Sequence, residues 1–422
     1  MTMKGPVKLD VFDVLSLTMT LVATDHLKKR ILRDRFNSTI FEKGRGREIF
    51  LVGGYVRDIL MGLVSSDRDF IVRGNLHSFV REVGDIIGGT VIQFKKGNLI
   101  RIVSKEGITF DFSGTTGTLR ADLSQRDFTI NAIAWSPHRG IVDYSHGLED
   151  IKNKRIRALS KKNMIADPLR ILRAYRFAAE LNGFIEYRTR EIIKTLRDKI
   201  KEVSPERITS ELFDLLNSRD SSRYLRMSLN DGLLTEILPF PFKKLEKNIR
   251  EIYKLERMTL KDHFLKIKVL LDQLFSQNLT HKGLLCLILL IKDDNHFSEI
   301  PNLRFSKRII RHTELVDRGM KLCGNRRRIP SDILFDIFVE SKEASGDVLL
   351  IKNRFDLNCE YRRFQKIWRN GLLSAEEIIH ISEINSGSGI GEIIEKLKRA
   401  QFVGKIQTKR AAIDFIKQAI SY

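Results

Sequence analysis

The sequence LVGGYVRD, which begins at Leu51, constrains the fold of this chain more than any other stretch, because Asp67-Arg-Asp69 follows it closely. Its apolar start favours a strand that ends at Gly53-Gly54, and the residues after the glycines favour a helix. A second strand then begins at Asp67. The pattern predicts a strand, a helix and a second strand over residues 48–52, 56–60 and 67–72.

Asp67 and Asp69 are two residues apart in the predicted second strand, so their side chains point to the same face. Paired carboxylates suit Mg²⁺, which takes few carboxylates from a protein and completes its coordination with water and substrate phosphates. Asp111, between Phe110 and Phe112, is a third candidate ligand, since a buried aspartate without a partner would be unfavourable. A shared metal would remove that cost. Aspartate is also an ordinary turn residue, so the first pair alone does not decide the matter.

Gly53, Gly54 and Arg57 occupy the turn and the start of the predicted helix. Backbone N–H groups beside a helix N-terminus form an anion site, and Arg57 adds a charge-assisted donor. The glycines could instead serve only the tight turn. Together with the carboxylates, this pattern indicates phosphate binding beside a metal, which is the chemistry of nucleotidyl transfer.

Three longer motifs carry a resemblance to a known family. They are LVGGYVRDILMG with SSDRDF, QRDFTINAIAW from Gln125, and DPLRILRAYRFAAEL from Asp167. In this order, and continued by Glu206-Arg-Ile-x-x-Glu211, they resemble the class II tRNA nucleotidyltransferases. That family includes CCA-adding, CC-adding and A-adding enzymes and the related bacterial poly(A) polymerases. The resemblance covers roughly the first 215 residues.

The resemblance implies an α+β chain, with a polymerase-beta-type nucleotidyltransferase head on a mixed sheet and an all-helical neck, body and tail. The implied bounds are 1–155 for the head, 156–225 for the neck that recognises the base, 226–340 for the body and 341–422 for the tRNA-binding tail. The body resembles an HD phosphohydrolase scaffold around Asp262-His263. Lys292-Asp-Asp294 stands where that scaffold carries its metal-binding His-Asp pair, so we expect no phosphohydrolase activity.

Polar and apolar residues alternate over residues 126–132, which predicts a strand with one polar face. The resemblance assigns Arg126 and Asp127 to nucleotide contacts and Asn131 to supporting hydrogen bonds. The family more often has two arginines before this aspartate. Gln125 takes the first position here, so one positive charge is missing.

Asp167 begins a predicted helix with an apolar stripe, and an aspartate N-cap followed by proline is a favoured helix start. The alternative role is base recognition together with Arg170. Cytosine and adenine present an amino donor beside a ring-nitrogen acceptor, which a carboxylate and a guanidinium match, whereas uracil and guanine present the reverse. Ala166 stands where the family usually has glutamate. Arg173 and Arg176 either reach the triphosphate or face solvent.

The expected reaction transfers a nucleotide from ATP or CTP to the 3′-hydroxyl of tRNA, with two Mg²⁺ ions held by Asp67, Asp69 and Asp111. Family members that build the whole CCA end have a long flexible segment before the Arg-Asp-Phe motif, whereas only Ser113 to Gln125 fills that gap here. We therefore expect a partial activity that adds A or C. A complete CCA-adding enzyme and a poly(A) polymerase are the alternatives.

Composition agrees with an RNA partner, since 74 Lys and Arg against 53 Asp and Glu give a net charge of +21. Nine basic and two acidic residues fall between Arg304 and Arg328. Three widely separated cysteines fit a reducing cytoplasm better than a disulfide framework, and we expect a cytoplasmic protein. No apolar run approaches the length of a membrane helix. Residues 11–23 are apolar in places, but aspartates in and beside this stretch interrupt the apolar run. We therefore expect a helix packed on the head there rather than a signal peptide.

Overall fold

The computed structural model describes residues 27–65, 67–94, 98–259, 269–292, 300–382 and 388–420, without the side chains of Asp67, Ser388 and Ile420. The helix expected over residues 11–23, the Asp262-His263 pair and Asp293-Asp294 lie outside these residues. The chain divides into two compact units, residues 1–211 with 227–237 and residues 212–226 with 238–422. The finer division into head, neck, body and tail stays a prediction.

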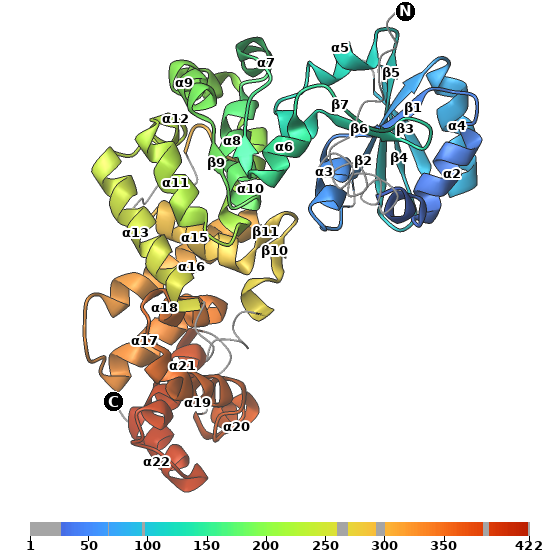
Figure 1. Ribbon diagram of the computed structural model, residues 1–422. Helices are drawn as coiled ribbons and strands as arrows, with labels where there is room; N and C mark the ends of the chain where they lie inside the picture. Colours follow the sequence, from blue (N-terminus) through green and yellow to red (C-terminus); the bar gives the residue numbers. More distant parts are fainter. Residues whose placement is uncertain are drawn as a thin grey trace, which may run out of the picture. The chain divides into compact units, whose positions relative to one another are not determined.

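The first unit contains a seven-stranded mixed sheet with the strand order β3-β4-β5-β2-β1-β6-β7 (Figure 1). Its strands are β1 (Ile49–Val52), β2 (Asp67–Arg73), β3 (Thr90–Gln93), β4 (Leu99–Val103), β5 (Thr109–Thr115), β6 (Ile133–Ser136) and β7 (Gly140–Asp143). β2 and β5 run parallel, and the other neighbouring pairs run antiparallel. The sheet confirms the expected mixed-sheet head.

The alternation of side chains along the strands separates two packing layers. Phe70 and Phe112 belong to the larger core, on the face that α2 (Arg35–Lys43) and α4 (Leu76–Ile87) cover, together with residues of α3 (Gly54–Leu60). Ile71 belongs to a smaller core with Leu123 of α5 (Leu119–Leu123). We call this second side of the sheet the α5 face. It also carries Asp69, because Asp69 and Ile71 are two residues apart.

The strand expected over residues 126–132 is wrong. Phe128 forms one isolated bridge with Ala158, Thr129–Asn131 is a 3₁₀ helix, and the strand β6 begins only at Ile133. The carboxylate of Asp127 accepts hydrogen bonds from the N–H of Phe128 and the side chain of Asn131, which favours a turn over a ladder. Apart from the half-buried Arg126, both the polar and the apolar residues of this stretch are buried, so their alternation does not mark an exposed face.

Helices follow the sheet in the first unit. They are α6 (Gly147–Lys152), α7 (Lys161–Ala166), α8 (Leu169–Glu180), α9 (Tyr187–Leu196) and α12 (Leu233–Ile237), with a short parallel pair, β8 (Arg155–Ile156) and β9 (Phe184–Ile185). Asp231 ties two of these helices together, since its carboxylate accepts from Tyr175 of α8 and, at both oxygens, from Arg190 of α9. Two further helices, α10 (Pro205–Asn217) and α11 (Ser221–Asn230), contain residues of both units.

The second unit is mostly helical, as expected. Its elements are α13 (Phe242–Thr259), the hairpin β10 (Leu274–Ser276) and β11 (Leu279–Thr280), α15 (His281–Leu290), α16 (Lys307–Cys323), α17 (Ser331–Ser341), α18 (Ser345–Ile351), α19 (Asn358–Arg369), α20 (Ala375–Ser382), α21 (Ser388–Phe402) and α22 (Lys409–Ile420). Asp347 joins three helices through Nε2 of His281 and of His312, each 2.7 Å away. Among the described residues, no helix is long and apolar enough to cross a membrane.

Candidate active site

The predicted strand, helix, strand unit is present as β1, α3 and β2. Gly53 is required at the turn for two reasons. Its φ of +74° lies in a region that residues with a side chain rarely adopt, and a Cβ there would clash with the guanidinium of Arg126 and approach Oδ2 of Asp69 to 3.1 Å. The glycine therefore allows the turn to pass directly beneath two polar side chains of the site.

Asp69 and Asp111 lie directly opposite each other on the parallel strands β2 and β5, on the α5 face. Asp111 already has a cationic partner, because Arg101 of β4 donates from Nε and Nη2 to its two oxygens at 2.7 Å each. Arg101 thus balances the negative charge of Asp111, which the sequence analysis expected a metal to balance. The backbone of Asp67 begins β2, and its side chain is outside the described part of the chain.

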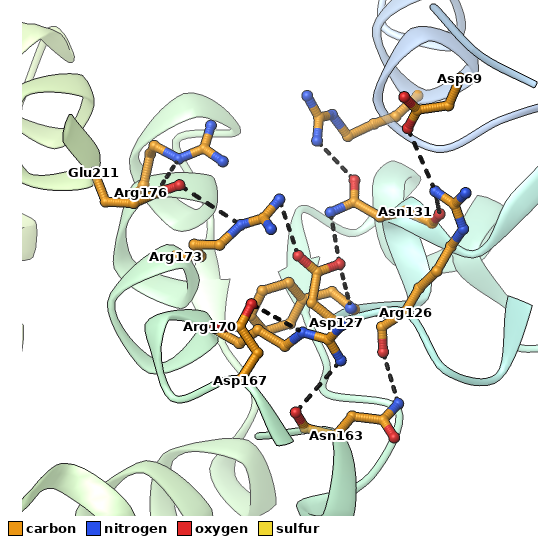
Figure 2. Close-up of polar contacts among 12 residues, drawn as sticks. Asp69, Arg126, Asp127, Asn131, Asn163, Asp167, Arg170, Arg173, Arg176 and Glu211 are labelled. Carbon is orange, nitrogen blue, oxygen red and sulfur yellow. Dashed lines mark hydrogen bonds and ion pairs between the residues drawn. The ribbon is translucent and has the colours of Figure 1, made fainter. Parts of the chain in front are cut away.

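Arg57 and Asn131 form a second part of the site. Arg57 donates from Nη1 to Oδ1 of Asn131 at 2.7 Å and is also paired with Asp58. Its guanidinium lies 4.8 Å from the ring centroid of Phe177. Nη1 of Arg126 lies 3.7 Å from Oδ2 of Asp69 (Figure 2). These contacts hold two arginines of the phosphate-binding prediction at one place.

Asp127 is a buried carboxylate at the centre of the site, only 5% exposed. Burial alone would raise its pKa. The ion pair with Arg173, at 3.1 Å, and the hydrogen bonds from Asn131 and Phe128 more than offset burial, so the pKa of Asp127 lies below its usual value. The group is therefore held as a carboxylate that fixes Asn131 and Arg173 in place.

α8 presents Arg170, Arg173 and Arg176 toward the same space, because residues three apart on a helix share a face. Glu211 of α10 holds two of them, with Oε1 3.7 Å from Arg173 and Oε2 2.6 Å from Arg176 (Figure 2). Sequence reasoning includes Glu211 only as the end of a motif and gives it no partner. The structure identifies it as the residue that orients these arginines.

Asp167 is not the helix N-cap that one sequence interpretation expected, since α8 begins after Pro168 without a side-chain cap. Its carboxylate instead accepts from Nη2 of Arg207 at 3.1 and 3.0 Å. Arg170 lies beside it, with Nε 3.9 Å from Oδ2, and donates from Nη1 to the backbone oxygen of Gln125 at 2.9 Å. The predicted acceptor and donor are therefore adjacent, and Arg207 is an unpredicted third member.

These residues surround a hollow of about 520 Å³ within the first unit. Its lining includes Arg57, Asp69, Asp111, Arg126, Asp127, Asn131, Arg170, Arg173 and Arg176, all of them predicted from the sequence, together with Arg101. Among the described residues, seven arginines and four aspartates line the hollow, an excess of positive charge that favours an anionic ligand. The volume is typical of small-molecule sites. Gly54 also lines the hollow, whereas Gly53 and Asp167 do not.

The donor atoms of the site fit Mg²⁺. Asp69 and Asp111 place carboxylates in register on neighbouring strands at the same hollow, and Asp111 would have to give up a contact with Arg101 to bind a metal. Mg²⁺ commonly takes only one or two protein carboxylates and completes its shell with water and phosphate oxygens. Among the described residues no group of three His, Cys, Asp or Glu side chains is placed to hold a metal. A metal here would therefore depend on Asp67 or on substrate phosphates for its other ligands.

The known proteins and family models that this chain resembles are tRNA nucleotidyltransferases and domains of poly(A) polymerases. A family model of the poly A polymerase head domain matches residues 103–157, and a model of the probable RNA- and SrmB-binding site of polymerase A matches residues 184–245. The chain is 29% identical over 391 residues to a CC-adding tRNA nucleotidyltransferase of Geobacter sulfurreducens, covering 86% of this chain and 90% of that relative.

Two further similarities differ in extent. An A-adding tRNA nucleotidyltransferase of Halalkalibacterium halodurans is 33% identical over 195 residues, which cover 41% of this chain and 46% of that relative. The solved structure of the Thermotoga maritima CCA-adding enzyme complexed with tRNA has a similar fold, with a TM-score of 0.74 and 20% identity over 94% of this chain and 98% of that one.

Proposed function

We propose that this chain adds the two cytidines of the CCA end to tRNA. It belongs to the family of tRNA nucleotidyltransferases and related poly(A) polymerases. The observation that carries this proposal is the hollow in the first unit, where two carboxylates in register face a wall of arginines. A nucleoside triphosphate needs cationic contacts, and transfer of its nucleotidyl group to a hydroxyl, with release of pyrophosphate, needs carboxylates for a metal. Both are present in one place.

Some polar residues of the hollow would bind the metal and the triphosphate, and others hold the arginines in position. Asp67, Asp69 and Asp111 would hold Mg²⁺, whose chemistry there would be to activate the 3′-hydroxyl and to neutralise the leaving pyrophosphate. Gly54 lines the hollow and would allow the triphosphate to approach the backbone, while Gly53 makes the turn before it. Around these groups, the cationic contacts to the phosphates come from Arg57, Arg126, Arg173 and Arg176. Glu211, Asp127 and Asn131 keep three of these arginines in place through the contacts described above, namely Arg57, Arg173 and Arg176.

Base selection falls to Asp167 and Arg170. A carboxylate only accepts hydrogen bonds and a guanidinium only donates them, so the pair matches the amino group and ring nitrogen of cytosine and opposes uracil. For this role Arg170 has to turn toward the base the N–H groups that do not bond to Gln125. Asp167 has to replace one of its hydrogen bonds from Arg207 with a hydrogen bond from the base. Selection would then occur without a nucleic-acid template.

Two observations favour CC addition over the alternatives. The CC-adding relative matches the chain over 90% of its own length, whereas the A-adding relative is matched over 46%. The connection from Ser113 to Gln125 is also short, and it is largely occupied by the end of β5 and by α5. Complete CCA addition is expected to need a longer mobile segment, and this connection is too short to contain one.

Nucleotide choice provides the test of the proposed function. We expect purified protein with Mg²⁺ and a tRNA transcript that lacks CCA to incorporate CMP when CTP is the sole nucleotide, and to incorporate neither UMP nor GMP. Extension by ATP alone, on tRNA and on unrelated RNA alike, would instead identify a poly(A) polymerase. Absence of incorporation from every nucleotide would refute the proposal.

Arg101 leads to a prediction about metal affinity. Replacing Arg101 by glutamine removes a positive charge from the site and releases both oxygens of Asp111, so we expect about fivefold tighter binding of Mn²⁺, a substitute for Mg²⁺. Electron paramagnetic resonance of free Mn²⁺ measures this binding without nucleotide or RNA. The same substitution should have a clearly smaller effect when Asp111→Asn is already present. Unchanged or weaker Mn²⁺ binding by Arg101→Gln would contradict the prediction.

A further inference from the structure

A second hollow lies on the α5 face, at the other end of the strands that carry the carboxylates. The register of β2 and β5 places Asp69 with Asp111, then Ile71 with Ser113, and then Arg73 with Thr115 in successive rows along this face. Four residues of strand separate Asp69 from Arg73, which is about 13 Å. Ile71 of the middle row packs against Leu119 and Leu123 of α5. Leu119 and Arg120 of α5 line the second hollow, whereas no α5 residue is among the described lining residues of the first.

The lining of this hollow, about 220 Å³ in volume, is rich in arginine. Arg73, Arg120 and Arg139 come from the end of β2, from α5 and from the turn before β7, respectively. Glu48 is the one acidic residue among the described lining residues, and it pairs with Arg73 at 2.9 Å and with Arg139 at 3.5 Å. Three positive charges against one negative charge favour an anion in this place.

Tyr144 adds an aromatic surface to the same wall. Its side chain is 38% exposed, and the guanidinium of Arg120 lies 5.5 Å from its ring centroid. An exposed aromatic ring beside arginines is the arrangement on which proteins stack bases of single-stranded RNA while they neutralise its phosphates. With less than half the volume of the candidate active site, the hollow suits one phosphate and one base face better than a nucleoside triphosphate.

We propose that this arginine-lined hollow binds the RNA substrate, with a phosphate among Arg73, Arg120 and Arg139 and a base against Tyr144. The inference rests on the proposed function, because an RNA chain whose 3′ end lies at Asp69 and Asp111 passes within reach of the same sheet face. The hollow then contributes to holding RNA and takes no part in binding the incoming nucleotide.

The test compares two double variants of the full-length protein. Arg120→Ala with Arg139→Ala removes two exposed charges from the hollow. Arg45→Ala with Arg81→Ala removes two exposed charges that do not line it, one from the connection after α2 and one from α4. Fluorescence anisotropy with labelled tRNA, at several salt concentrations and without nucleotide, gives the Kd and its salt dependence. Thermal melting confirms that both variants are folded.

We expect the hollow variant to bind tRNA about tenfold more weakly and to lose about one unit of the slope of log Kd against log salt concentration. The KM for CTP should stay within twofold, and the control variant should behave as wild type. Equal weakening in both variants, no weakening in either, or a raised KM for CTP with unchanged tRNA binding would each overturn the proposal. Because binding is measured without catalysis, a wild-type protein that binds tRNA and transfers no nucleotide would refute only the proposed function.

Discussion

Replacing Asp69 by asparagine should lower the rate of CMP incorporation by about 10³-fold or more while leaving tRNA binding within twofold of wild type. Asparagine has nearly the shape of aspartate and lacks its charge, so the hollow keeps its form and loses a metal-binding carboxylate. The Asp69 side chain is 45% exposed, and its contact with Arg126, at 3.7 Å, is longer than a hydrogen bond, so we expect the variant to fold. Single-turnover rates at saturating CTP measure the effect.

Asp85→Asn provides the matched control for Asp69→Asn. Asp85 is exposed on α4, on the opposite side of the sheet, and its substitution changes charge in the same way. It should leave both the rate and tRNA binding unchanged. An Asp69→Asn protein that retains a tenth or more of the wild-type rate would show that the reaction takes place without this carboxylate, and the assignment of the hollow as the active site would fail.

Replacing Asp167 by asparagine should largely abolish the choice of cytosine over uracil. An amide can both donate and accept, so it removes the mismatch with the uracil carbonyl as well as the good contact with the cytosine amino group. The substitution changes one or two hydrogen bonds to the base, so we expect the ratio of kcat/KM for CTP over UTP to fall by about 10²-fold. Steady-state kinetics with each nucleotide and a CCA-lacking tRNA transcript give this ratio.

Arg207→Gln separates base selection from the local ion pair. This substitution also breaks the contact between Arg207 and Asp167, yet it leaves the carboxylate in place. The CTP preference should therefore persist in Arg207→Gln and be lost in Asp167→Asn. If both variants retain wild-type discrimination, the base is recognised elsewhere in the site.

The local part of the fold was predictable because it depends on neighbouring residues. Gly53-Gly54 and the alternation around Asp69 were sufficient to predict β1, α3 and β2. Residues 126–132 show the limit of the same reasoning. Alternation predicted a strand there, but the carboxylate of Asp127 bonds to the backbone of Phe128 and to Asn131, and these local hydrogen bonds favour a turn.

Partners that are distant in sequence could not be identified from spacing. Arg101 meets Asp111 because β4 and β5 pair in a register that places them opposite each other, and no pattern in either segment specifies that register. Glu211 and Arg207 reach the site from α10. The sequence therefore indicates most of the residues that would contact a nucleotide and misses three that orient them, Arg101, Arg207 and Glu211.

The most direct test of the account is the 3′-end sequence of tRNA transcripts after incubation with the protein, Mg²⁺, CTP and ATP. One transcript ends at the discriminator nucleotide and another ends after CC. The account predicts two added cytidines on the first transcript and no addition to the second. One adenosine added only to the second would identify an A-adding enzyme, and a complete CCA on the first would contradict the argument from the short connection. No addition to either transcript would contradict the central claim that the hollow around Asp69 and Asp111 is a nucleotidyltransferase site.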